Sequence, residues 1–353
     1  MAGTGLEPKH PVQSMTLISI ASAFALSFVL TALMRRYAIS ARLLDHPNAR
    51  SSHSIPTPRG GGVGVVIAFI AFVAVSGCFG SMSRQVVLAL LGSGGVVAAV
   101  GFLDDRGHVP ARWRFLSHLL AGIWGLYWLG GIPPVPIFGH SIDLGWPGLI
   151  LAVTYIVWMV NLYNFMDGID GIAGIEAITV SLGGALTWWL ATGTTDWTVP
   201  VVFAACVAGF LIWNYPPARI FMGDSGSGFV GLVLAMFSLW AGGQIPLLFW
   251  CWFILLGTFM VDATTTLVRR VRRGERFSEA HRSHGYQYAA RKHRSHRTVA
   301  LAFGAINILW LLPVAVLVAM GKVDGVVGVI VAYAPLITLA FHYKAGVRHA
   351  QET

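Results

Sequence analysis

Charge is scarce in this sequence. Only 11% of its 353 residues are Asp, Glu, Lys or Arg, only 15 are acidic, and 56% are hydrophobic. Long apolar runs recur, and a transmembrane helix needs about 20 mainly apolar residues. A soluble domain of this length shows apolar stripes broken by polar faces instead. The composition therefore excludes that class and predicts an all-α, polytopic integral membrane protein.

Cysteine is sparse as well. Cys78, Cys206 and Cys251 all lie in apolar surroundings, where cysteine usually behaves as a small hydrophobic residue. They predict neither a disulfide framework nor a metal site. No cleaved signal peptide is recognisable, because the first apolar run ends in Arg35-Arg36, the order expected of a membrane anchor.

Apolar runs predict eleven transmembrane helices in one domain that covers residues 1–353. They are expected near residues 15–34, 61–80, 86–103, 115–131, 146–164, 171–192, 198–213, 226–242, 244–267, 298–320 and 324–342. Residues 1–14 are expected to form an external tail, and residues 268–297 a basic cytoplasmic loop.

Lysine and arginine are unevenly distributed between alternate loops. With the N-terminus outside, all 24 of these residues except Lys9, Arg84 and Lys322 fall on the inner side. Because cytoplasmic loops carry the excess of basic residues, the sequence predicts an external N-terminus and a cytoplasmic C-terminus. The net charge of +9 is then topological, and no nucleic acid is expected as a partner.

Five aspartates lie at the ends of apolar segments, in the motifs GFLDDRG, NLYNFMDGIDG and FMGDSGSG. They are Asp104, Asp105, Asp167, Asp170 and Asp224. Ionisable groups at membrane depth are costly and usually functional, and acidic clusters of this kind hold Mg²⁺. The predicted topology puts all five on the inner side, so we expect a cytoplasmic active-site cleft.

Asp104 and Asp105 are adjacent at a predicted helix end, so their carboxylates cannot point the same way. One is expected to bind a cation or act as a base while the other orients it. The alternative is a solvated pair neutralised by Arg106, Arg112 and Arg114. Two close like charges raise one pKa unless a metal or an arginine compensates.

The other two motifs combine acids with amides, glycine and serine. Asn161 and Asn164 repeat the three-residue spacing of Asp167 and Asp170, which favours a polar ligand at the membrane surface over a capping turn with incidental acids. Asp224 precedes a Gly/Ser helix start. Free N–H groups there suit a phosphate, and the carboxylate suits Mg²⁺ that bridges the phosphate.

The basic segment 268–297 contains His281 and His284. Histidine and arginine in this segment are suited to grip a diphosphate or a phosphate headgroup. The alternative is a solvated face that meets anionic lipid headgroups. No cysteine or acid completes a convincing zinc-binding set with these histidines.

Together these motifs resemble those of the polyprenyl-phosphate N-acetylhexosamine-1-phosphate transferase family, membrane enzymes of bacterial glycan assembly. The resemblance covers residues 40–300, with PTPRGGG, DD, NLYNFMDGIDG, FMGDSGSG and a His-bearing basic loop in order. It implies a helical bundle that transfers a sugar 1-phosphate from a UDP-sugar to undecaprenyl phosphate, with Mg²⁺, and releases UMP. Mn²⁺ is the alternative ion.

The resemblance also implies roles for individual residues. Asp224 is the expected metal ligand, and Asp104, Asp105 and Asp167 are the expected catalytic residues, with the choice of base left open. The expected substrate-binding residues are Arg59, Asn161, Asn164, Asp170, Asn214, Phe221, His281, Arg282 and His284. Phe221 is expected to stack on the nucleotide base.

The segment SEAHRSHGYQ lacks the contiguous HHH that the cell-wall branch, which transfers phospho-MurNAc-pentapeptide, carries after a proline. This favours the branch that initiates O-antigen or related surface polysaccharides, with UDP-GlcNAc or a 6-deoxy-HexNAc as donor. The expected location is the bacterial inner membrane, with membrane lipids as neighbours and homodimerisation left open. The alternative functions are a transporter or flippase of an anionic lipid-linked sugar and a non-enzymatic membrane scaffold.

Overall fold

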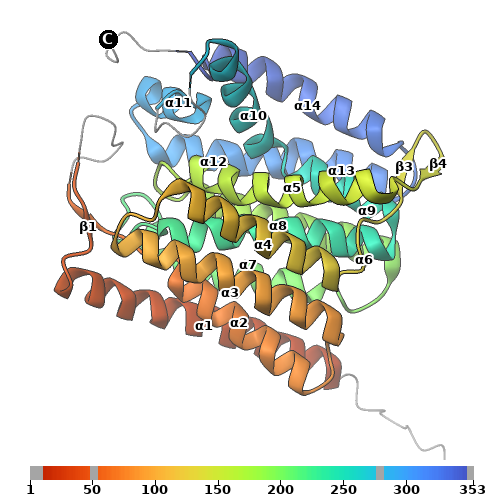
Figure 1. The fold of residues 1–353 in the computed structure, drawn as a ribbon, viewed down its shortest axis with the longest axis horizontal. Helices are drawn as coiled ribbons and strands as arrows, with labels where there is room; N and C mark the ends of the chain where they lie inside the picture. Colours follow the sequence, from red (N-terminus) through yellow and green to blue (C-terminus); the bar gives the residue numbers. More distant parts are fainter. Residues whose placement is uncertain (1–10, 48–54, 276–281, 348–353) are drawn as a thin grey trace, which may run out of the picture.

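The computed structural model describes residues 11–47, 55–275 and 282–347 as a bundle of long helices that run side by side (Figure 1). The helices are α1 (Pro11–Ser40), α2 (Val63–Cys78), α3 (Arg84–Arg106), α4 (Ala111–Trp128), α5 (Gly145–Met166), α6 (Ile172–Thr192), α7 (Thr198–Asn214), α8 (Gly223–Gln244), α9 (Pro246–Leu255), α10 (Gly257–Arg272), α11 (Gly285–His293), α12 (His296–Ile306), the π-helical turn η1 (Asn307–Leu311), α13 (Leu312–Ala319) and α14 (Gly325–His342). Two antiparallel hairpins pair β1 (Leu44–Asp45) with β2 (Thr57–Pro58) and β3 (Val135–Ile137) with β4 (His140–Ile142).

The prediction of an all-α polytopic membrane protein is confirmed. Within the described residues, seven helices are long and apolar enough to cross a membrane, and α9 with α10 makes an eighth if the bent pair counts as one span. The helices α2 and α7 are apolar but shorter. The count of eleven spans and the orientation in the membrane stay predictions.

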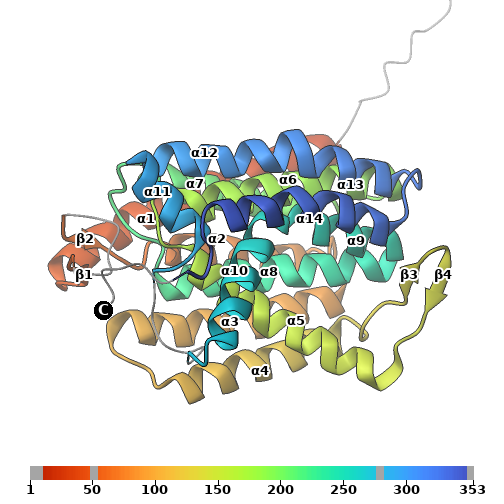
Figure 2. The same cartoon turned by 90° about the horizontal axis from the view of Figure 1, so that it is seen from above.

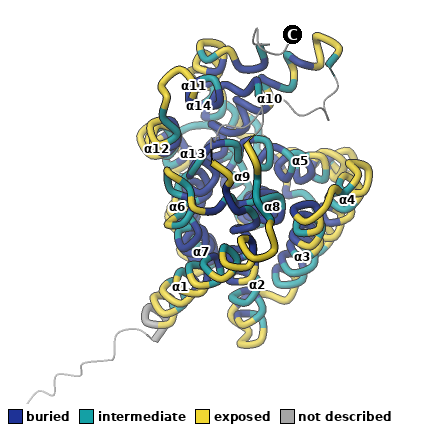
Figure 3. The backbone as a smooth tube through the Cα atoms, turned by 90° about the vertical axis from the view of Figure 1, so that its left-hand side faces the viewer, coloured by how far each residue is buried: buried dark blue, intermediate teal, exposed yellow. Residues whose placement is uncertain are grey.

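Helix α8 forms the centre of the bundle. It packs against α3, α5 and α9, and 89% of its apolar window is buried, whereas the corresponding windows of α1 and α14 are 17% and 28% buried. Figure 3 shows this contrast, with dark, buried helices inside and exposed faces on the outer helices. Exposed apolar faces on outer helices are suited to lipid contact, because lipid does not penalise them.

One expected span is broken in the structure. The span expected at 244–267 is divided into α9 and α10, which meet at an angle of 69°. The basic stretch 268–297 contains the end of α10, all of α11 and the start of α12, and residues 11–14 belong to α1. The cytoplasmic position of that stretch and the external position of the N-terminal tail stay predictions.

The two ends of the bundle differ. Figure 2 shows β1, β2 and α11 at one end and the β3–β4 hairpin at the other. The C-terminal ends of α3 and α5 and the N-terminal end of α8, which carry the acidic motifs, lie at the end with α11. All three motifs are therefore presented at one end of the bundle, as the sequence predicts.

Candidate active site

Asp105 holds the beginning of α8 in place. Its Oδ1 accepts the backbone N–H of Asp224 at 3.0 Å, and its Oδ2 accepts that of Ser225 at 3.1 Å. The first N–H groups of a helix have no partner within the helix, and a carboxylate is a favourable partner at this positive end of the helix dipole. The Gly/Ser helix start therefore does not offer these two N–H groups to a phosphate, contrary to the expectation from its sequence.

Asp224 and Asp104 share a contact with Arg114. Asp224 lies in the first turn of α8 rather than before it. Asn164 donates to Asp224 Oδ1 at 2.8 Å. Arg114 pairs with Asp104 and reaches to 3.5 Å from Asp224 Oδ2. Two acids, one amide and one cation thus meet at a single point, contributed by α3, α4, α5 and α8.

Asp167 follows the last residue of α5 and is half-buried. Burial, and then the charges of Asp224, Asp105 and Asp170, raise the pKa of Asp167 well above its ordinary value. Asp167 therefore lies close enough to the other aspartates to feel their negative charges. A carboxyl whose pKa is raised is suited to accept and return a proton.

Other sequence-predicted residues engage the backbone. Asn214 is buried, accepts the N–H of Gly171 at 2.9 Å and donates to the carbonyl of Ile220 at 2.9 Å. Asp170 accepts the N–H of Ala218 at 3.1 Å. These side chains connect the turn after α5 to the segment before α8, so they hold the two acidic motifs together.

Three further predicted residues have polar or backbone contacts at the same end. The amide of Asn161 donates to the carbonyl of Val157 at 2.7 Å. Asp170 Oδ2 lies 3.4 Å from Nδ1 of His296. Arg59 donates to the carbonyl of Asp105 at 2.5 Å, so the PTPRGGG motif is tied to the acidic pair.

Phe221 connects the PTPRGGG motif to the start of α8. Its N–H donates to the carbonyl of Pro58 at 2.8 Å, and its carbonyl accepts the N–H of Gly61 at 2.8 Å. Gly62 packs so closely on α8 that a Cβ there would lie 2.3 Å from the Cα of Gly226. The half-buried Phe221 ring is thus held beside the acidic motif, and its stacking on a nucleotide base stays a prediction.

The histidine segment is organised by an acid that the sequence analysis did not select. Asp262 in α10 accepts the N–H groups of Gly285 at 2.9 Å and Tyr286 at 2.8 Å, and it lies 3.3 Å from Nδ1 of His284. His284 is buried and precedes α11. Arg282 is half-buried. His281 lies outside the described residues.

Sequence reasoning missed Asp262 and Tyr286. Asp262 interrupts the apolar run FMVDATTT, and a single acid inside an apolar segment is the signal that could have found it. Tyr286 gives no such signal, because its position depends on how α11 folds back.

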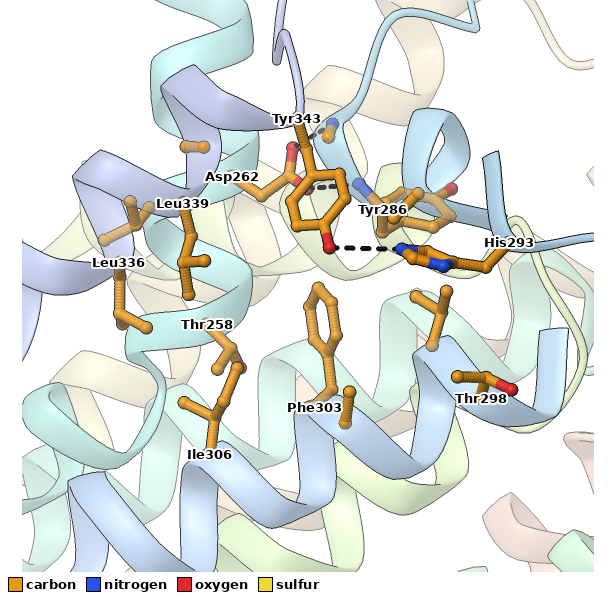
Figure 4. A pocket seen from close by; sticks show the side chains of 16 residues that line it. Thr258, Asp262, Tyr286, His293, Thr298, Phe303, Ile306, Leu336, Leu339 and Tyr343 are labelled. Carbon is orange, nitrogen blue, oxygen red and sulfur yellow. Dashed lines mark hydrogen bonds between the residues drawn. The ribbon is translucent and has the colours of Figure 1, made fainter. Parts of the chain in front are cut away.

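A pocket of about 360 Å³ lies between α10, α11, α12 and α14 (Figure 4). Its lining is mainly apolar and includes Phe303 and Leu336. Tyr286 lines this pocket, and its hydroxyl donates to the carbonyl of Phe165 at 3.0 Å, two residues before Asp167. Burial, and then the charges of Asp262 and Asp167, raise the pKa of Tyr286, so the hydroxyl keeps its proton and remains a donor.

The donor set fits Mg²⁺ only with help from a substrate. Within the described part of the chain, no three His, Cys, Asp or Glu side chains converge to hold a metal ion. Asp104 and Asp224 both contact Arg114, so their carboxylates approach the same point. Mg²⁺ is usually bound by one or two carboxylates, water and substrate phosphates. Asp224 and Asp104 therefore suit an ion that arrives with a diphosphate.

Comparison with known proteins gives consistent matches. Residues 86–242 match glycosyl transferase family 4. A probable undecaprenyl-phosphate N-acetylglucosaminyl 1-phosphate transferase of Bacillus subtilis is 29% identical, covering 85% of this chain and 86% of the relative. A decaprenyl-phosphate N-acetylglucosaminephosphotransferase of Mycolicibacterium smegmatis is 27% identical, covering 97% and 92%. A phospho-N-acetylmuramoyl-pentapeptide-transferase of Symbiobacterium thermophilum is 34% identical over a shorter stretch, 62% of this chain and 70% of the relative.

Proposed function

The chain belongs to glycosyl transferase family 4, and from that premise we propose that it transfers N-acetylhexosamine 1-phosphate from a UDP-sugar to undecaprenyl phosphate. The observation that carries the proposal is the meeting of Asp104, Asn164 and Asp224 with Arg114 at one end of the bundle. The relatives that match most of the chain are named for the transfer of N-acetylglucosamine phosphate to polyprenyl phosphates.

In the proposed reaction, a phosphate oxygen of the acceptor attacks the β-phosphorus of the UDP-sugar. A new P–O bond forms, the bond from the β-phosphorus to the bridging oxygen breaks, and UMP leaves with the electron pair. Phosphoryl transfer of this kind depends mostly on positioning and on neutralising charge. Holding two anionic substrates together is therefore the main task of the site.

The residues divide that task between them. Asp224 and Asp104 would hold Mg²⁺, which neutralises the diphosphate charge. Arg114, already close to both acids, supplies a fixed positive charge beside them. Asp167, with its raised pKa, accepts and returns a proton at the acceptor phosphate. Arg282 and His284 face the same end of the bundle and approach the phosphates of the donor.

The acceptor reaches the site from the side. A polyprenyl chain is apolar and lies in the membrane, whereas its phosphate must reach the polar active site. The protein therefore needs an apolar path for the chain that ends near the acidic residues. The pocket between α12 and α14 gives such a path, and Tyr286 stands at its inner end, next to the turn that carries Asp167. We place the first prenyl units in this pocket and the phosphate beyond Tyr286.

The finer assignments extend the same proposal. The donor is UDP-GlcNAc or a 6-deoxy-HexNAc, the product is the first lipid-linked sugar of a surface polysaccharide, and the active site faces the cytoplasm of the bacterial inner membrane. UDP-sugars are made in the cytoplasm, so the reaction and the predicted topology require the same face.

Label exchange tests the proposal. Purified protein incubated with unlabelled UDP-GlcNAc, radiolabelled UMP and undecaprenyl phosphate should exchange label between UMP and UDP-GlcNAc only when the lipid phosphate and Mg²⁺ are present. A panel of UDP-sugars in the same assay identifies the sugar. Absence of exchange with every UDP-sugar, together with movement of a lipid-linked sugar across proteoliposomes, would reject the transferase in favour of a transporter.

A further inference from the structure

The bend between α9 and α10 exposes a helix N-terminus deep inside the bundle. The two helices meet at 69°, and the first N–H groups of a helix have no partner within that helix. Inside a membrane protein such a helix end needs polar contacts from elsewhere in the protein, because water is absent. A carboxylate on another helix contacts the side chain of Thr258 at the start of α10.

That carboxylate belongs to Glu176 in α6, whose side chain is fully buried. The hydroxyl of Thr258, in the first turn of α10, donates to this carboxylate and lies 2.8 Å from each of its oxygens. A negative side chain at this end is favourable for the helix dipole, so Glu176 holds the start of α10 from another helix.

The same carboxylate also reaches a third segment. Asn307, the first residue of the π-helical turn, donates to Glu176 Oε2 at 2.7 Å and to Thr179 Oγ1 at 2.8 Å. π-Helical turns are rare and are frequent at functional sites. Glu176 therefore connects three elements: its own helix α6, the start of α10, and the π-helical turn η1 that follows α12.

The far end of α10 leads to the histidine segment. Thr258 lies one helical turn before Asp262 on α10, and Asp262 accepts the first N–H groups of α11. Figure 4 shows Thr258 and Asp262 on α10 with Tyr286 beyond them. The direction of α10 thus decides where Asp262 lies, and Asp262 decides where α11 begins.

We propose that Glu176 is a positioning residue for the transfer reaction. It fixes the direction of α10 at the bend and thereby places Asp262, the N-terminus of α11 and the His284–Tyr286 segment at the active site. Its role in the reaction rests on the proposed function, whereas its effect on α11 does not.

Amide hydrogen exchange tests the structural part independently of activity. In detergent or nanodiscs, Glu176→Ala should speed exchange of a peptide that contains Gly285 and Tyr286 by about tenfold, because the acceptor of their N–H groups shifts away. Glu176→Gln keeps an acceptor and should restore most of the protection. Thr258→Val, which keeps the volume and removes one donor, should have a smaller effect in the same direction.

Thr187→Val is the matched control. Thr187 is also fully buried on α6, but its hydroxyl donates only to the carbonyl of Gly184 in its own helix. It should leave exchange at α11 unchanged. The proposal is overturned if amide exchange at α11 is unchanged in both Glu176→Ala and Thr258→Val. It is also overturned if exchange in Glu176→Ala rises as much at α3 and α5 as at α11, because the whole protein would then be destabilised.

Kinetics test the functional part. Glu176→Ala should lower kcat/KM for the UDP-sugar by about tenfold, and its effect should be less than additive with that of Asp262→Asn, because both act on α11. Fully additive effects would overturn the route through Asp262. If the wild-type protein shows no transfer, the proposed function has failed, and the exchange result still decides whether Glu176 positions α11.

Discussion

The two neighbouring aspartates at the end of α3 have different tasks. Asp105 uses both oxygens on the N–H groups of Asp224 and Ser225, whereas Asp104 pairs with Arg114, which also approaches Asp224. A helix end turns successive side chains about 100° apart, so one member of the pair can fix α8 while the other contributes to the charged centre. Removing either should have distinct consequences.

The first prediction concerns the metal ligand. Asp224→Asn should reduce transfer by at least about 100-fold, because an amide replaces the anionic ligand at the charged centre, while the protein still folds and keeps the Asn164 contact. Activity measured against Mg²⁺ and Mn²⁺ concentration checks it. Asp143→Asn, at an exposed aspartate, is the control, and near-normal turnover of Asp224→Asn at ordinary Mg²⁺ would contradict the assignment.

The second prediction concerns pH. Because the pKa of Asp167 is raised in the folded protein, its contribution to stability is fully present below its ordinary pKa and is lost as the pH rises through the raised value. Asp167→Asn removes this loss. Without Mg²⁺ or substrate, the variant should unfold at a higher temperature than the wild type at pH 8, and the difference should shrink toward pH 4.

Thermal melts in EDTA across that pH range make the comparison, with Asp143→Asn as the reference for an exposed acid. The same Asp167→Asn variant should lose activity, since an amide cannot exchange a proton. If the melting temperature of Asp167→Asn fell relative to that of the wild type as the pH rises, the raised pKa of Asp167 would be contradicted.

At the scale of elements, the site depends on how closely α3 approaches α8. A Cβ at Gly101 would lie 2.6 Å from the backbone of Asp224 and Ser225. Glycine thus lets the two helices meet where Asp105 reaches the start of α8. Close contacts of this kind are common between membrane helices, where small residues let the backbones approach.

The third prediction follows from this contact. Gly101→Ala should push α3 away from α8, cost about 1–3 kcal/mol of stability and lower transfer strongly, because Asp224 moves with the helix start. Gly95→Ala on the same helix adds its methyl group to open space and should leave stability and activity almost unchanged. Equal effects of both substitutions, measured by melts and label exchange, would refute the argument.

The elements show where sequence reasoning succeeds. Long apolar runs predicted most helices, because membrane burial fixes their length and composition. The break between α9 and α10 and the helix α11 were not predictable, since they are held by Glu176 and Asp262, which are distant from them in the sequence. At the site, Asp104, Asn164 and Asp224 were predicted from motifs. Asp262 and Glu176 were missed because the motif search looked for clustered polar residues and neither acid belongs to such a cluster.

At the scale of the whole molecule, one end of the bundle carries the acids, the histidine segment and most of the basic residues. The opposite end carries the β3–β4 hairpin. The turn between α6 and α7, which contains the exposed Thr194, meets the C-terminal end of α8 through the hydrogen bond from Gln244 to Asp196. In the predicted orientation, the candidate active-site residues therefore lie on the cytoplasmic side of the membrane, and none of them lies on the external side. Ser52 and Ser278, in the two inner segments, lie outside the described residues.

The fourth prediction tests this orientation. In a background without cysteine, which also removes the exposed Cys78, an impermeant maleimide applied to intact cells should label Thr194→Cys and should not label His108→Cys. The exposed His108 follows the acidic pair. Ser52→Cys and Ser278→Cys should likewise stay unlabelled until the cells are opened. Labelling of His108→Cys from outside would invert the topology and remove access to cytoplasmic UDP-sugars.

The central position of α8 also has a consequence for how the protein is made. During synthesis α8 enters the membrane after α3 and α5 but before α9, and these three helices are its packing partners. A helix with almost no lipid-facing surface can settle only when all its neighbours have arrived. The bundle around α8 is therefore incomplete until the ribosome has passed α9, although the four helices that meet at the acidic centre have all been made by then. A chain that stops after α8 carries all five motif aspartates and still lacks α9, one of the helices that pack against α8.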